Sequence, residues 1–265
     1  MAETKKILIT KMTLLLTAAM VLLCGACSLD KDNLTAANVE ATSDVIITND
    51  IEITIKTLCI ICEKVENISA RIAGGQALGI EISDDGKQWS HVFDTELLSG
   101  KIIVDIEQSA DNLAIIKNID CSNLKIHYSD AIWLKLFGTI IVEDINEDRD
   151  KVTTNGFGYN NNLVVLPQIT INSDYRVARS IRSGTGHLVN VLAQGSSYGE
   201  SKQLGTYSQT ITSDLKIDET TYNIIAGKMI IYLENVSEIN PIEVTYSATG
   251  RTIKYKGNEN RTYYK

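Results

Sequence analysis

Four side chains with oxygen ligands alternate along one short acidic segment of the chain: Asp144, Asn146, Asp148 and Asp150. Carboxylate and amide oxygens in such an alternation are typical ligands of calcium. Arg149 stands where a calcium loop of the EF-hand type has its turn glycine, so the pattern also fits a solvated acidic linker. Calcium at these four residues is the only cofactor that the sequence predicts.

One motif could present a nucleophile. Residues 195–199, Gly-Ser-Ser-Tyr-Gly, match the G-x-S-x-G spacing of hydrolases, in which a helix follows the serine. Residues 200–205 show no helical pattern, and the three histidines, His91, His127 and His187, stand in no metal-ligand spacing. We therefore expect a protein without catalytic activity.

Four aromatic residues are candidates for binding a ligand by stacking: Trp89, Trp133, Tyr159 and Tyr198. An indole or phenol ring can stack on a sugar, but it can also anchor a core, as the apolar neighbours of both tryptophans suggest. The two tyrosines stand in segments rich in glycine, asparagine and serine, which we predict to be loops. Loops carry much of the function on β scaffolds, so these tyrosines are the better candidates.

The first thirty residues resemble a signal that targets the chain to a membrane. Three lysines are followed by an apolar run, Met12–Leu23, that is too short for a stable transmembrane helix. Gly25 and Ala26 then precede Cys27. This layout resembles a bacterial lipoprotein signal, which implies cleavage before Cys27 and attachment of acyl chains such as palmitate to it. The alternative is an ordinary secretory signal that is cut near Ala26 and leaves Cys27 as a free thiol.

The residues after the cysteine, Ser28-Leu29-Asp30-Lys31-Asp32, resemble the export tag of Bacteroidetes-type surface lipoproteins. The resemblance implies a protein anchored by lipid in the outer membrane and facing the cell exterior. We predict a signal peptide at 1–26 and a tether at 27–44. Such a compartment is oxidising, and the sequence does not decide whether Cys59 or Cys62 forms a disulfide with Cys121. Cys59 and Cys62 are not expected to pair with each other, because in a strand residues three apart point to opposite faces.

The sequence predicts β-strands over the rest of the chain. Ile51–Lys56 alternates apolar and polar residues, and Leu58–Cys62 is a short apolar run typical of a strand. A further strand is predicted at Ile68–Ile72. Asp84–Lys87 contains Asp-Gly and predicts a hairpin turn, with Trp89–Phe93 as the return strand. The predicted fold is all-β.

A break in the strand pattern divides the body into two predicted β-sandwich domains of jelly-roll or immunoglobulin-like type. The first covers 45–145 and the second 163–265, with a linker or loop at 146–162 that is rich in acidic, asparagine and glycine residues. Many short strands separated by turns favour such sandwiches over alternating strands and helices.

Residues 79–89, Gly-Ile-Glu-Ile-Ser-Asp-Asp-Gly-Lys-Gln-Trp, resemble the strand–turn–strand of discoidin-like, galactose-binding-like jelly rolls. Residues 131–138, Ala-Ile-Trp-Leu-Lys-Leu-Phe-Gly, occupy the place of a later strand of that family. The resemblance implies a discoidin-like first domain that binds a glycan, a lipid or a protein, without specifying which.

Charge and address together favour a binding protein. The formal net charge of −8 makes nucleic acid a poor partner, since phosphate binding needs clustered lysine and arginine. We expect a non-catalytic adhesion or carbohydrate-binding module at the cell surface that recognises a glycan or a host or partner protein. The alternative is a structural or anchor subunit of a fimbria-like or nutrient-uptake assembly in the outer membrane, joined through edge strands.

Overall fold

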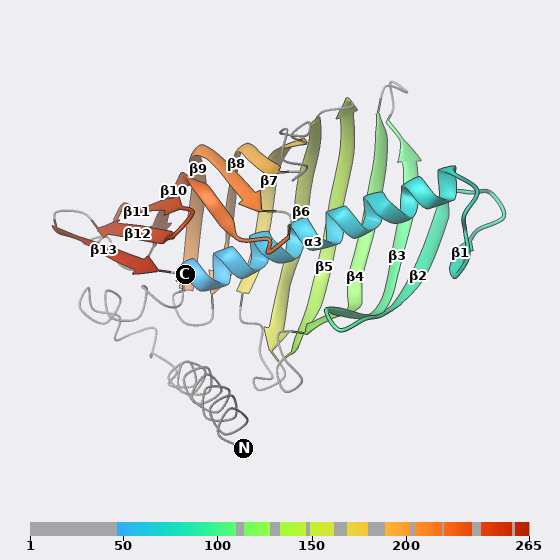
Figure 1. Ribbon diagram of the computed structural model, residues 1–265, viewed down its shortest axis with the longest axis horizontal. Coiled ribbons are helices and arrows are strands. Elements are labelled where there is room, and N and C mark those ends of the chain that lie inside the picture. The colour runs from blue at the N-terminus through green and yellow to red at the C-terminus, as the bar shows by residue number, and fades with distance from the viewer. Residues whose placement is uncertain are drawn as a thin grey trace, which may run out of the picture.

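A computed structural model describes ten segments of the chain, residues 47–109, 114–127, 133–146, 149–161, 169–179, 189–201, 205–218, 220–234, 240–255 and 258–264. Within them, a single long helix crosses one face of an antiparallel sheet of thirteen strands (Figure 1). No helix in this part of the chain combines the length and apolar character needed to cross a membrane.

Helix α3 runs over Ile47–Ala73 and replaces three predicted strands. The predictions of strands at Ile51–Lys56, Leu58–Cys62 and Ile68–Ile72 were wrong. The segment contains no glycine or proline, and its apolar residues recur at helical spacing over six turns. Over the six residues from Ile51, however, that spacing cannot be distinguished from the alternation of a strand.

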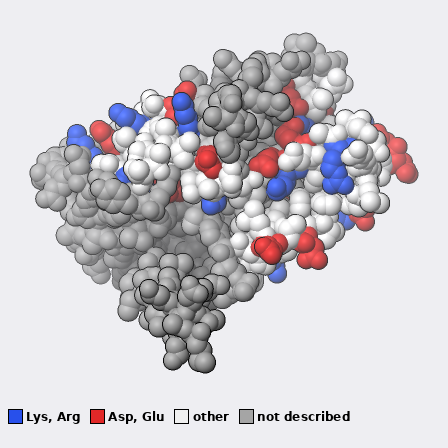
Figure 2. Space-filling model, viewed as in Figure 1, with Lys and Arg blue, Asp and Glu red and all other residues white. Residues whose placement is uncertain are grey.

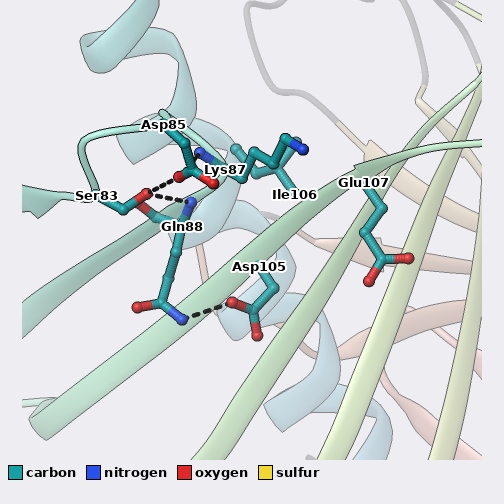
Figure 3. A pocket seen from close by; sticks show the side chains of 7 residues that line it. All are labelled: Ser83, Asp85, Lys87, Gln88, Asp105, Ile106 and Glu107. Carbon is teal, nitrogen blue, oxygen red and sulfur yellow. Dashed lines mark hydrogen bonds between the residues drawn. The ribbon is translucent and has the colours of Figure 1, made fainter.

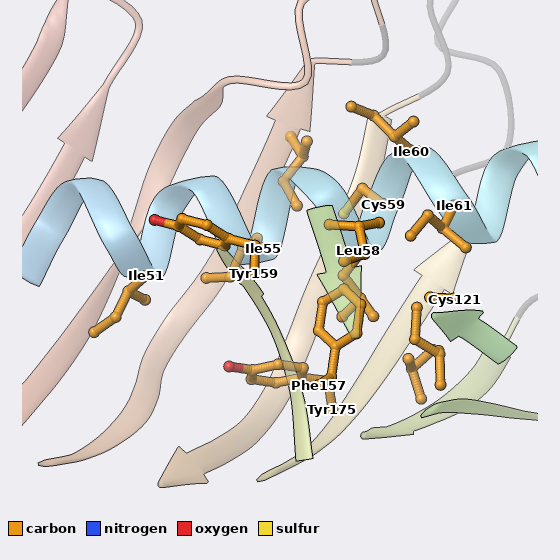
Figure 4. Packing of buried hydrophobic residues seen from close by; sticks show 14 of the residues in the cluster. Ile51, Ile55, Leu58, Cys59, Ile60, Ile61, Cys121, Phe157, Tyr159 and Tyr175 are labelled. Carbon is orange, nitrogen blue, oxygen red and sulfur yellow. The ribbon is translucent and has the colours of Figure 1, made fainter. Parts of the chain in front are cut away.

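The buried residues of α3 follow that helical spacing, except at 58–61, where four consecutive apolar residues are buried. Its fully or nearly fully buried apolar residues are Ile51, Ile55, Leu58, Cys59, Ile60, Ile61, Val65 and Ile68. They pack over the aromatic rings of Phe157, Tyr159 and Tyr175 on the sheet (Figure 4). The helix ends at Gly74 and Gly75, where Gly75 adopts a φ of 73°, a conformation that glycine reaches without strain.

Each strand of the sheet pairs with the next one along the chain, from β1 to β13. The strands are β1 (Ile80–Ile82), β2 (Gln88–Asp94), β3 (Leu98–Gln108), β4 (Ile115–His127), β5 (Trp133–Asn146), β6 (Arg149–Asn161), β7 (Ile169–Arg179), β8 (Val189–Ser201), β9 (Gly205–Asp218), β10 (Ile224–Leu233), β11 (Ile242–Ser247), β12 (Gly250–Tyr255) and β13 (Asn258–Tyr264). Because all the links join neighbours, the sheet is a meander with two open edges, at β1 and β13.

The hairpin predicted at Asp84–Lys87 is confirmed. It joins β1 to β2, and Gly86 takes a φ of 70° in the turn. The Gly86 amide donates a hydrogen bond of 2.9 Å to the Ser83 carbonyl, and the Ser83 hydroxyl donates one of 2.7 Å to Asp85. Asp-Gly therefore acts here as the local turn signal that the sequence indicated.

The prediction of a mostly β protein is confirmed, but the division into two sandwiches is not. The strands before and after the predicted boundary belong to one sheet, and β6 occupies most of the predicted linker at 146–162. Trp89 on β2, Ile61 on α3 and Ile253 on β12 share one hydrophobic cluster. A helix, rather than a second sheet, covers the apolar face of the strands, and either arrangement can bury such a face.

Three glutamates of α3 bind partners on the sheet or its turns. Glu52 accepts a hydrogen bond of 2.7 Å from Arg251 of β12. Glu63 accepts one from the hydroxyl of Tyr222, which precedes β10, and Glu66 accepts one of 2.6 Å from Lys117 of β4. These hydrogen bonds help to fix the position of α3 on the sheet, because each carboxylate reaches its partner in only one position of the helix.

Candidate ligand-binding surface

Strands β8, β9 and β10 bring two exposed tyrosines to one face of the sheet. Tyr198 of β8 lies opposite Ser208 of β9, and Ser208 lies opposite Tyr232 of β10. Tyr198 is 62% exposed and Tyr232 47% exposed. The two residues are two strand spacings apart, which places their backbones about 10 Å from one another. We call Tyr198 and Tyr232 the tyrosine pair.

The tyrosine pair lies on the face opposite α3. Tyr207 and Gln209, on either side of Ser208 in β9, are buried in the core. Ile231 and Leu233 are buried on either side of Tyr232. Successive side chains of a strand point to opposite faces, so the tyrosines point away from the helix.

Hydroxyl groups and carboxylates surround the tyrosine pair. In the register of the three strands, one flanking row is Ser196, Thr210 and Ile230, and the other is Glu200, Thr206 and Glu234. Only Ile230 among these six is apolar, and none is basic. The face thus presents two separate aromatic rings in a polar setting, rather than a continuous apolar patch.

Tyr198 was a sequence candidate, and Tyr232 was missed. Tyr198 lies in strand β8 instead of the predicted loop. Tyr232 could have been found from its setting, because it stands alone between the buried Ile231 and Leu233 in an alternating strand. The pairing of the two tyrosines depends on strand register, which the sequence does not show.

The other aromatic candidates lie elsewhere. Trp89 is 2% exposed and Tyr159 3% exposed, so both rings are in the core beneath α3. Trp133 is half-buried at the start of β5, and the Lys125 ammonium lies 4.5 Å from the centre of its ring. A cation already covers this indole, in a contact that stabilises the sheet surface.

The acidic segment forms the adjoining ends of β5 and β6. Asp144 pairs with Asp150 across the two strands, and Lys117 lies 3.1 Å from an Asp144 carboxylate oxygen. The side chain of Asn146 and the whole of Asp148 are outside the described residues. Within the segments that are described, no group of three or more histidine, cysteine or acidic side chains is placed to hold a metal. Calcium stays a prediction.

Lys117 is the centre of an ion cluster with Glu66 and Asp144. Its side chain is only 7% exposed, and its ammonium lies 2.6 Å from Glu66. Burial by itself would lower the pKa of Lys117, but the hydrogen bonds and charges of Glu66 and Asp144 outweigh it and raise that pKa. The cluster therefore holds a charged lysine between α3, β4 and β5.

The G-x-S-x-G motif lies within strand β8. Ser197, its central serine, is buried on the helix side, and its hydroxyl donates a hydrogen bond of 2.9 Å to Gln209. Tyr175 donates to the same amide oxygen at 3.0 Å. The serine thus belongs to a polar network inside the core, a position that no substrate reaches from the surface.

A shallow hollow of about 390 Å³ lies beside the first hairpin (Figure 3). It is lined by Ser83, Asp85, Lys87 and Gln88 of the hairpin and by Asp105, Ile106 and Glu107 of β3. Gln88 donates a hydrogen bond of 2.6 Å to Asp105, and bonding from Ser83 lowers the pKa of Asp85. Hydrogen bonds thus already link four of the polar lining residues, Ser83, Asp85, Gln88 and Asp105, so the hollow is better explained as part of the hairpin than as a ligand site.

The three cysteines of the described residues are free thiols. Cys59 and Cys121 are buried, and Cys62 is partly buried. Burial, with a smaller contribution from the Glu63 charge, raises the pKa of Cys59 to about 12. Burial likewise raises the pKa values of Cys62 and Cys121. Thiols in this setting are unreactive, because the thiolate is the nucleophile.

On the helix side of the molecule, acidic and basic side chains are intermingled over the described surface (Figure 2). Neither sign forms a broad patch on that view, so it gives no charge-based indication of a ligand. The tyrosine pair is therefore the strongest candidate site.

Comparison with models of known protein families, with curated proteins and with solved structures finds no match for this chain.

Proposed function

We propose that this protein is a lipid-anchored binding protein of the outer cell surface that recognises a glycan through the tyrosine pair. The single observation that carries the proposal is the exposure of Tyr198 and Tyr232 in one row across the strands, on the sheet face opposite the helix. Large aromatic rings are usually buried, and a pair left in water is a candidate contact surface.

The neighbours of the tyrosine pair favour a glycan over a protein. The centre of a protein interface is depleted of charged residues and enriched in apolar contact area. Here the rings are separated by Ser208 and bordered by Glu200 and Glu234. A sugar presents both kinds of surface at once, with C–H groups on the ring face and hydroxyls at its edge.

The lipid anchor rests on the sequence. The signal peptide at 1–26, the acylated Cys27 and the tether at 27–44 lie outside the described residues. The anchor would hold the folded body near the membrane, and more than one acyl chain would make the attachment stable. Labelling cells with a palmitate analogue tests it: the label should enter the wild type and be absent from Cys27→Ser.

The alternative of an assembly subunit has less support. It needs an exposed apolar edge strand on which a second chain can pair. Edge strand β1 has only three residues, and edge strand β13 carries the polar sequence Asn-Glu-Asn-Arg-Thr-Tyr-Tyr. Short or polar edges are typical of sheets that avoid such pairing.

A glycan array tests the proposed function. The mature lipidated protein in detergent micelles should bind one class of glycan saturably. Tyr198→Ala and Tyr232→Ala should each weaken that binding about tenfold, the loss of about 1.4 kcal/mol of stacking and buried area. Val92→Ala, which changes a 61% exposed residue on β2, is the matched control and should bind as the wild type does.

Circular dichroism and urea unfolding of each variant must match the wild type, so that a loss of binding is not a loss of folding. An array on which the wild-type protein binds nothing contradicts the proposal. Binding that survives both tyrosine substitutions would place the site on another surface.

A further inference from the structure

The spacing of the tyrosine pair indicates the shape of the glycan that it takes. We infer that Tyr198 and Tyr232 hold two sugar residues of one extended, ribbon-like chain, a β-1,4-linked hexose polymer that crosses β8, β9 and β10 and places every second residue on a ring. This inference rests on the proposed function and adds the linkage class, the direction and the minimum length of the ligand.

Strand register sets the distance between the two tyrosines. Both are opposite Ser208 of β9, so the row that joins them runs across the strands. A residue of an antiparallel sheet forms a hydrogen-bonded pair with one neighbour and a non-hydrogen-bonded pair with the other, with Cα distances of about 5.5 and 4.5 Å. The two tyrosine backbones are therefore about 10 Å apart, and a ligand that touches both rings must cross the strands.

The path between the rings is open. Tyr198 is 62% exposed and Tyr232 47% exposed, and the residue between them, Ser208, is exposed and small. No large side chain of β9 therefore stands between the rings in this row. The Ser208 hydroxyl, which can both donate and accept a hydrogen bond, faces the sugar residue that bridges the gap.

A ribbon-like chain matches this row. In a β-1,4-linked hexose chain each residue is turned over relative to the one before it, so the first and third residues present the same face to one side. Their separation is about that of two strand spacings, ~10 Å. An α-1,4-linked glucose chain curves as it grows, so its first and third residues do not lie flat over both rings.

Sheet twist favours a single chain over a crystalline surface. Neighbouring strands of a twisted sheet are rotated by about 20–25°, which turns the surface at Tyr232 by about 45° from that at Tyr198. Two glycosidic links of an isolated chain can take up this rotation. The flat, packed chains of a crystalline polysaccharide cannot, so the expected ligand is a single chain.

Competition binding to the mature lipidated protein in detergent micelles tests the inference. The probes are fluorescent hexasaccharides of β-1,4-linked glucose, mannose and N-acetylglucosamine, of which at least one should bind. The unlabelled trisaccharide of that sugar is the shortest chain that reaches both rings, so it should compete about tenfold more strongly than the disaccharide. It should come within about threefold of the hexasaccharide, and α-1,4-linked maltohexaose should compete at least tenfold more weakly than the hexasaccharide.

A spacing variant shows whether the distance between the rings matters. Ser208→Tyr combined with Tyr232→Ser keeps the composition of the surface but brings the two rings to neighbouring strands. It should bind the hexasaccharide about tenfold more weakly and lose the advantage of the trisaccharide over the disaccharide. Val92→Ala, on β2, is the control with no change expected, and circular dichroism and urea unfolding must show that each variant is folded.

The outcomes separate this inference from the proposed function. The inference is overturned, and the glycan site stands, if the tyrosine variants lose binding but the disaccharide competes as well as the trisaccharide or the spacing variant binds as the wild type does. Equal competition by maltohexaose, or a glycan of another linkage as the ligand on the array, has the same meaning. If no glycan binds, and a protein retained from outer-membrane extract is lost on Tyr232→Ala, the surface binds protein and both proposals fail.

Discussion

Replacing Lys117 with methionine should weaken the attachment of the helix to the sheet. Methionine keeps the unbranched stem of the lysine but removes its charge, so that Glu66 and Asp144 face one another without a cation. Breaking a fully buried ion pair costs about 3–5 kcal/mol, and breaking an exposed one less than about 1 kcal/mol. The carboxylates are 30% and 29% exposed and the lysine 7% exposed. We therefore expect a loss between these limits, about 2–3 kcal/mol of unfolding free energy at pH 7.

The pH dependence makes this prediction specific. The hydrogen bonds and charges of Glu66 and Asp144 raise the pKa of Lys117, so the charged lysine stabilises the folded state below pH 10.5 and this stabilisation is lost as the pH rises further. The cost of Lys117→Met should therefore shrink as the pH rises from 7 to 11. Urea unfolding of wild type and variant at pH 7 and pH 11 measures both values.

Lys64→Met is the matched control, since Lys64 on α3 is 35% exposed and lies 3.5 Å from Glu63. It should cost less than about 1 kcal/mol at either pH. A loss for Lys117→Met that is as small as the control, or that is the same at pH 11 as at pH 7, would refute the reasoning that the cluster is a buried charge network.

Three further predictions concern the core. Ile61→Ala, at a residue with no exposed surface on α3, should cost about 2–5 kcal/mol in urea unfolding, whereas Val92→Ala should cost less than about 0.5 kcal/mol; similar values for both would contradict the packing of α3. Thr57→Val should stabilise the fold by about 1 kcal/mol, because the buried Thr57 hydroxyl has no hydrogen-bond partner among the described residues. A destabilised variant would show that the hydroxyl is satisfied. The raised pKa of Cys59, about 12, stabilises the folded state below pH 9, and this stabilisation is lost as the pH rises from 9 toward 12. Above pH 9 the wild type should therefore lose about 1.4 kcal/mol of unfolding free energy per pH unit more than Cys59→Ala does. An equal slope for the two proteins would place the thiol in water.

Local signals in the sequence predict local structure well. Asp84–Lys87 contains the residue types that a tight hairpin requires, and the turn is where the sequence places it. The β-branched residues of the body also predict a mostly β protein. These features depend on neighbours a few residues apart, so no tertiary information is needed.

Helix α3 shows where a local pattern is ambiguous. Six residues from Ile51 alternate like a strand, and only the apolar spacing that continues to Ile68 distinguishes a helix. Isoleucine and threonine have low helix propensity, so propensity also favoured the wrong choice. Burial against Phe157 and Tyr175 outweighs that preference, since packing supplies most of the stability of a helix in a protein.

The sequence also did not determine whether a second sheet or a helix packs against the apolar face of the strands. A row of amphipathic strands can bury its apolar face against a second sheet or against a helix, and both choices leave the same alternation in the sequence. The structure places α3 across strands from both predicted halves, and β6 joins those halves where a linker was expected.

By itself, the sequence determined the high β content and the first hairpin, and it made Tyr198 a candidate ligand-binding residue because of its aromatic ring. Only the tertiary structure decided that Tyr198 is exposed on a strand, that Tyr232 stands two strands away in the same row, and that Trp89 and Tyr159 are buried. The reason is physical: a side chain's type is local, but its exposure and its neighbours depend on strand register and on which face the helix covers.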